Sequence, residues 1–115
     1  MPHRVCESDS YARLSPKAVK LLVDLVTQFR GANNGDLAMA WGLMKERGWR
    51  SRDTVTKAGK ELIENGIIAQ TRQGGRNRCN LFAVTWLAID DCGGKLDVEP
   101  TNVPLGYWKD GHPPI

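Results

Sequence analysis

The sequence predicts a small α+β domain, in which three helices precede a two-stranded β-hairpin and an extended C-terminal arm. Apolar residues recur at three- and four-residue spacing in the first half of the chain, which is typical of amphipathic helices. Two apolar runs then flank a glycine-rich loop, which is typical of a hairpin. We expect a flexible N-terminal arm over residues 1–13, the domain over residues 14–89 and the extended arm over residues 90–115.

The first helix is predicted to begin at Ser15-Pro16, because serine suits an N-cap and proline suits the first helical position. Its end is expected near Arg30-Gly31, where glycine can adopt the left-handed conformation. Its apolar face comprises Ala18, Leu21, Leu22, Leu25, Val26 and Phe29, and its solvent face comprises Lys17, Lys20, Asp24 and Gln28.

A short second helix is predicted from Leu37, Ala40, Trp41 and Met44, after a turn over residues 33–36. A brief strand over Leu37 and Ala38 before that helix is the alternative. Gly48 ends it, so that only a few residues separate it from the third helix.

The third helix is predicted over residues 51–65, with Ser51 as N-cap and Asp53 at the positive end of the helix dipole. Its apolar stripe comprises Val55, Ala58, Leu62 and Ile63. The hairpin follows, with strands over residues 67–72 and 79–86 and a basic loop over residues 73–78. Both faces of the second strand are apolar, which predicts either that both are covered or that partner contacts continue the strand.

The C-terminal arm from Asp90 onward contains several prolines but keeps large apolar residues. It is too apolar for a free linker and too interrupted for a helix. It packs either on its own domain or on a second subunit, and Tyr107-Trp108 either anchors a partner or folds back. A homodimer formed through this arm is one expectation from the sequence.

Charge is distributed unevenly along the chain, whose formal net charge is +3. Residues 47–80 hold eight basic and three acidic residues, whereas residues 81–115 hold two basic and five acidic ones. A localised basic block favours an anionic partner, most commonly nucleic acid.

Several function classes find no support in the sequence. No apolar run is long enough for a membrane helix, and the N-terminus lacks a signal-peptide core, which favours a cytoplasmic protein. Cys6, Cys79 and Cys92 are expected to be reduced thiols. The spacing of the cysteines and of the two histidines, His3 and His112, fits no zinc site. Motifs for phosphate, dinucleotide or catalytic metal binding are lacking, so we expect no metal, no cofactor and no enzymatic activity.

The basic block places candidate DNA-binding residues on two neighbouring elements. Those of the third helix and its start are Arg50, Ser51, Arg52, Thr54, Thr56, Lys57 and Lys60, and those of the hairpin are Arg72, Arg76, Asn77 and Arg78. A helix N-terminus attracts phosphate, and the forked guanidinium of Arg50 or Arg52 fits guanine O6 and N7. Lysine ammonium groups suit phosphate instead.

The stretch from Trp41 to Trp86, with KELIENGII over residues 60–68 and Gly74-Gly75 among arginines, resembles winged helix-turn-helix DNA-binding proteins. The resemblance extends over residues 15–86. More specifically, this stretch resembles small winged-helix proteins encoded by bacterial chromosomes, phages and plasmids. It implies that the helix over residues 51–65 enters the major groove and that residues 72–79 form a basic wing. The expected function is sequence-specific binding of double-stranded DNA, in transcription regulation or replication. The alternative is a winged-helix module that binds protein and not DNA.

Overall fold

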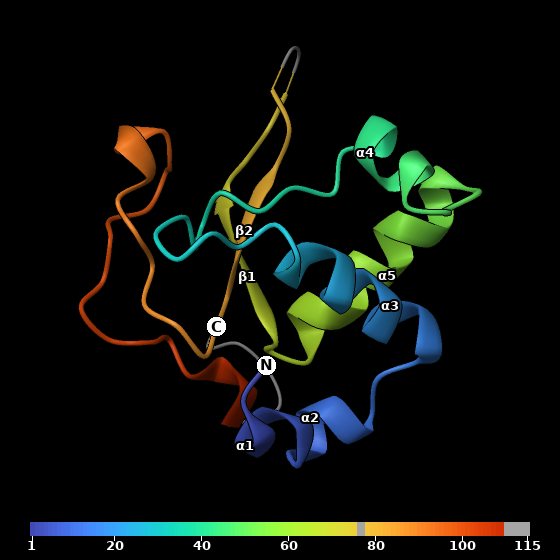
Figure 1. The fold of residues 1–115 in the computed structure, drawn as a ribbon, viewed down its shortest axis with the longest axis horizontal. Helices are drawn as coiled ribbons and strands as arrows, with labels where there is room; N and C mark the ends of the chain where they lie inside the picture. The colour runs from blue at the N-terminus through green and yellow to red at the C-terminus, as the bar shows by residue number, and fades with distance from the viewer. Residues whose placement is uncertain (76–77, 110–115) are drawn as a thin grey trace.

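The computed structural model describes residues 1–75 and 78–109, which form an α+β fold with helices preceding a two-stranded antiparallel hairpin (Figure 1). The helices are α1 (His3–Cys6), α2 (Asp9–Ala12), α3 (Pro16–Val26), α4 (Trp41–Glu46) and α5 (Arg52–Glu64). The strands are β1 (Ile68–Arg72) and β2 (Leu81–Val84), and the 3-10 turns η1 (Cys92–Gly94) and η2 (Tyr107–Lys109) follow them. The three predicted helices correspond to α3, α4 and α5.

Residues 1–13 differ from the expected flexible arm, because they form α1 and α2 and pack against the rest of the chain. Val5 is fully buried, and Ser8 caps α2 by accepting a hydrogen bond from the Tyr11 N–H. The Ser10 hydroxyl donates a 2.6 Å hydrogen bond to the carbonyl of Trp108. Helices of four residues are too short to show a helical period, so the sequence pattern could not indicate them.

Helix α3 begins where predicted, with Ser15 accepting a hydrogen bond from the Ala18 N–H, but it ends at Val26 and not near Arg30. The Thr27 hydroxyl donates to the Asp24 carbonyl, which satisfies one of the last carbonyls of the helix. The Gln28 side chain pairs with the backbone of Ala38 through two hydrogen bonds. The backbone closes this end with a tighter turn, in which the Gln28 N–H donates to the Leu25 carbonyl and the Phe29 N–H donates to the Val26 carbonyl, each at 3.0 Å.

Leu37 forms an isolated antiparallel bridge with Phe82, through hydrogen bonds of 3.1 and 2.8 Å. The brief strand that the sequence left open is therefore present, and α4 begins only at Trp41. Gly48, at φ +93°, follows α4 and directs the chain toward α5. The bounds of α5 agree with the prediction, and Ser51 is its N-cap.

The hairpin pairs Ile68 with Val84 and Gln70 with Phe82, and a register shift separates Gln70 from Arg72. Both strands are shorter than predicted, although their order and pairing agree with the prediction. Every residue of β2 is buried, as the apolar character of both of its faces predicted. Helices α3, α4 and α5 lie on one side of this sheet and the chain after β2 runs along the other, whereas α1 and α2 lie below the sheet beside η2 (Figure 1).

The C-terminal segment contacts its own domain at several points within the described residues. The Asp97 N–H donates to the Thr71 carbonyl, and the Gly106 N–H donates to the Thr85 carbonyl, each at 2.8 Å. A Cβ on Gly66 would lie 2.6 Å from the carbonyl oxygen of Tyr107, so the backbones of the two segments are in close contact.

Asn34 joins the loop after α3 to the end of β2. Its side chain is fully buried, donates to the carbonyls of Val84, Leu87 and Ala88, and accepts from the Val84 N–H. A buried amide costs free energy unless its donors and acceptor are satisfied. Asn34 meets that requirement. The turn predicted over residues 33–36 therefore contains a side chain that is fixed by tertiary hydrogen bonds. Within residues 1–75 and 78–109, no helix has the length and hydrophobicity to cross a membrane.

Candidate nucleic-acid interface

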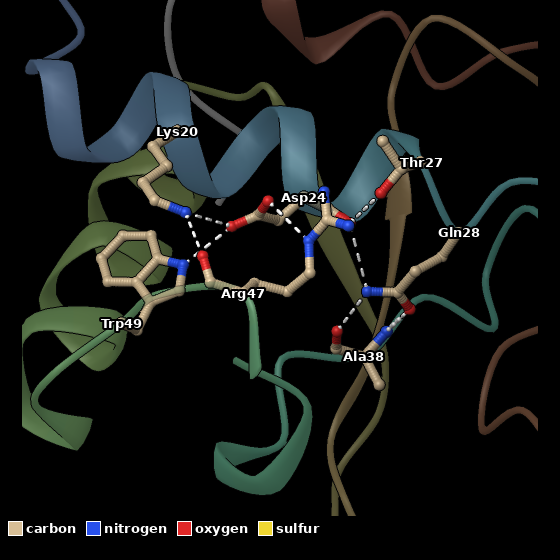
Figure 2. Close-up of polar contacts among 7 residues, drawn as sticks. All are labelled: Lys20, Asp24, Thr27, Gln28, Ala38, Arg47 and Trp49. Carbon is tan, nitrogen blue, oxygen red and sulfur yellow. Dashed lines mark hydrogen bonds and ion pairs between the residues drawn. The ribbon is translucent and has the colours of Figure 1, made fainter. Parts of the chain in front are cut away.

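A buried carboxylate on α3 fixes the turn that leads into α5 (Figure 2). Only 5% of the Asp24 side chain is exposed. Its Oδ2 accepts hydrogen bonds from Trp49 Nε1 at 2.8 Å and Lys20 Nζ at 3.0 Å, and its Oδ1 accepts one from Arg47 Nε at 3.1 Å. Lys20 also donates to the Arg47 carbonyl at 2.8 Å. These bonds tie α3 to residues 47–49 and so set the direction in which α5 begins.

The sequence prediction that Asp24 faces solvent is wrong. Burial alone raises the pKa of this carboxyl, but the hydrogen bonds from Trp49, Lys20 and Arg47 stabilise its ionised form more, so its pKa is lowered overall. The ammonium of Lys20 also lies 5.1 Å from the centroid of the Trp49 ring, within range of a cation–π contact. The carboxylate is therefore charged at neutral pH.

The N-terminus of α5 is exposed beside this turn. The Ser51 hydroxyl accepts a 3.4 Å hydrogen bond from the Thr54 N–H, so it is engaged as the helix cap. Arg50 and Arg52 on either side of it are exposed. Two exposed arginines thus flank the N-cap at the positive end of the helix dipole, which suits an anionic ligand.

A groove of about 550 Å³ lies between α5 and the hairpin. Arg52, Thr56 and Lys60 line it from α5, because residues four apart share one face of a helix. Gln70 and Asn80 line it from the hairpin. The exposed flank of α5 and one side of the hairpin therefore face the same groove.

The remaining candidate residues of α5 lie on another flank of the helix. Thr54 and Lys57 line a shallow hollow together with Ser15 and Lys17 at the start of α3. Lys57 and Asp53 form an ion pair of 3.0 Å whose side chains are 78% and 74% exposed. Exposed pairs of this kind contribute little stability, so the ammonium of Lys57 is accessible to a phosphate.

The hairpin arginines have different surroundings. Arg72 is half-buried, and its guanidinium donates to the Cys79 carbonyl across the hairpin, from Nε at 3.3 Å and from Nη2 at 2.9 Å. Arg78 is exposed, with its Nη2 4.0 Å from an oxygen of Asp97. Arg72 thus braces the hairpin, whereas Arg78 faces solvent. Arg76 and Asn77, the other two candidates, lie outside the described residues.

Several groove residues were not among the candidates. Met39, Trp41, Ile63 and Phe82 give the groove an apolar floor. Trp41 packs against the core and also lines the groove. Alternation along β1 places Gln70 on the exposed face, and this was the available signal for it.

Other kinds of site receive no support from the described residues. They contain no group of three His, Cys, Asp or Glu side chains arranged to hold a metal ion. Cys6, Cys79 and Cys92 are free thiols. Comparison with models of protein families, with curated proteins and with solved structures finds no match for this chain.

Proposed function

We propose that this chain is a winged helix-turn-helix protein that binds double-stranded DNA, with α5 as recognition helix and the hairpin as wing. The observation that carries the proposal is that Arg52, Thr56 and Lys60 line the same groove as the hairpin. The hairpin contributes the polar side chains of Gln70 and Asn80 to this groove, so a duplex bound there would contact α5 and the hairpin at once. A cytoplasmic regulator of transcription, or a factor in replication, is the role that fits such binding.

The residues divide by their chemistry. Arg52 stands in the first turn of α5, where a planar guanidinium can make two hydrogen bonds to guanine. Lys57 and Lys60 are exposed point charges better suited to phosphates. Arg78 adds a cation from the hairpin, and its exposure leaves it available to the backbone of a duplex.

A salt titration tests the proposal. Binding of the full chain to a fluorescent duplex of random sequence would be followed by anisotropy across a range of salt concentrations. Contacts to about four to six phosphates predict a log–log slope of roughly −4 to −5. Absence of binding at low salt would overturn the proposal.

The apolar floor of the groove favours a second function, the binding of a protein segment. Met39, Trp41 and Ile63 are partly exposed there and would bury apolar surface against a partner. A groove that binds only protein predicts no affinity for random duplex DNA, so the salt titration separates the two functions. A protein-binding groove would also retain its ligand when Arg52 and Lys60 are replaced by glutamine.

A homodimer formed through residues 90–115 is a further part of the proposal, because two recognition helices read a longer site. The contacts of the C-terminal segment to its own domain leave Val103 67% exposed and Val98 39% exposed. These side chains are available to a second copy. Light scattering of the full chain should give the mass of a dimer, and Val103→Asp should convert it to a monomer.

A further inference from the structure

At the base of the hairpin loop, the carboxylate of Asp97 contacts two groups that can bind an anion, a backbone N–H and a guanidinium. Oδ2 of Asp97 accepts a 2.8 Å hydrogen bond from the Gln73 N–H. Oδ1 of the same carboxylate lies 4.0 Å from Nη2 of Arg78. A backbone N–H and a guanidinium that converge on one anion are the kind of donors that bind DNA phosphates.

Neighbouring contacts hold Asp97 in this position. Its own N–H donates to the Thr71 carbonyl at 2.8 Å. Lys95, two residues earlier, makes a 2.9 Å ion pair with Asp36, and Leu96 lies so close to Gly35 that a Cβ there would be 2.7 Å from Leu96 Cδ1. Residues 95–97 are thus docked on the domain, and this holds the Asp97 carboxylate beside the hairpin.

We propose that Asp97 competes intramolecularly with DNA phosphate for the Gln73 N–H and Arg78. This inference rests on the proposed function and concerns the regulation of that same surface. The Asp97 and Arg78 side chains are 52% and 53% exposed, so water and salt screen their attraction. A phosphate can displace the carboxylate, and the competition lowers the affinity for any duplex without depending on its sequence.

A purely structural role for Asp97 makes a different prediction. If the carboxylate only positions the hairpin, Asp97→Asn should behave as the wild-type chain, because the amide oxygen still accepts from the Gln73 N–H. Asp97→Ala should then weaken binding, since it removes that acceptor. Competition predicts that both variants bind DNA more tightly.

The test measures affinity and salt dependence for a random-sequence duplex, using the full chain and its variants. We expect Asp97→Asn to tighten binding about two- to fivefold, the range typical of one exposed charge pair. The log–log salt slope should become steeper by up to about 0.9 if one more phosphate contact forms. Glu99→Gln, at an exposed carboxylate in the same segment, is the control for net charge and should change affinity less.

Arg78 provides the internal check. In a chain that already carries Arg78→Ala, Asp97→Asn should have a smaller effect, because one of the two competing donors is gone. If the wild-type chain binds DNA and Asp97→Asn leaves that affinity unchanged, the competition is overturned but the proposed function is not. The same holds if Asp97→Asn changes the affinity only as much as Glu99→Gln does. Absence of binding by every variant overturns the proposed function and the competition together.

Discussion

The indole N–H of Trp49 donates a 2.8 Å hydrogen bond to the carboxylate of Asp24, across 25 positions of sequence. Trp49 lies in the turn between α4 and α5, and Asp24 lies on α3, so this bond connects the core helix to the start of the proposed recognition helix (Figure 2). Both side chains are buried. The orientation of α5 therefore depends on a polar contact within the core.

Replacement of Asp24 by alanine should destabilise the fold. The substitution leaves the buried Trp49 N–H without an acceptor and removes the shared partner of Lys20 and Arg47. Loss of hydrogen bonds to a charged group predicts a decrease of about 2–3 kcal/mol in the free energy of unfolding. Urea denaturation would measure it, and Glu99→Ala, at an exposed position, should change stability by less than about 0.5 kcal/mol.

Asp24 should also make stability dependent on pH in the acidic range. The pKa of its carboxyl is lowered in the folded chain, so its contribution is complete above about pH 4, near the ordinary value for aspartate. That contribution is lost as the pH falls toward the lowered pKa. The difference in unfolding free energy between the wild-type chain and Asp24→Asn should therefore shrink below pH 4. A difference that stays constant from pH 7 to pH 3 would contradict this linkage.

Two glycines should respond in opposite ways to alanine. Gly66 has φ +72°, and a Cβ there would lie 2.6 Å from the backbone oxygen of Tyr107, so Gly66→Ala should cost about 2 kcal/mol or more. Gly42 lies in α4, and a Cβ there would meet no atom within 4 Å. Gly42→Ala should therefore stabilise the chain by about 0.5–1 kcal/mol. Thermal unfolding of both variants would show whether the signs differ.

Arg52 and Lys57 should contribute to DNA binding in different ways. If Arg52 contacts a base, Arg52→Ala should reduce discrimination between a selected site and random duplex by about 1–3 kcal/mol. If Lys57 contacts phosphate, Lys57→Ala should weaken all duplexes alike and reduce the salt slope by about 0.9. Binding curves for both duplexes at two salt concentrations separate these effects. Equal, sequence-independent losses in the two variants would contradict the assignment of base contact to Arg52.

Local signals were sufficient to predict much of the fold. Ser15 and Ser51 mark the starts of α3 and α5 because a serine cap depends only on the next few residues. The hairpin was predictable for the same reason, since its two apolar runs and glycine-rich loop are adjacent in sequence. The early end of α3 was not, because it depends on the contact of Gln28 with Ala38 ten positions later.

The candidate site was predictable only in part. The sequence alone shows that the stretch containing α5 and the hairpin is basic. The groove between the two elements depends on tertiary packing, which composition does not predict. Asp24 was assigned to the solvent face because its partners Arg47 and Trp49 are more than twenty positions away in the sequence. The contact of Asp97 with Gln73 spans 24 positions and left no local trace in the sequence.

The hydrogen bond from Ser10 to Trp108 spans 98 positions. Closing so long a loop carries a large entropic penalty, so α2 and η2 should dock only after the sheet and α5 have assembled. The contact between α2 and η2 should also open first under mild destabilisation, at a lower free energy than global unfolding. Amide hydrogen exchange near α1 and α2 should therefore be faster than exchange in α5, and the proposed DNA-binding surface should remain folded while α2 and η2 separate.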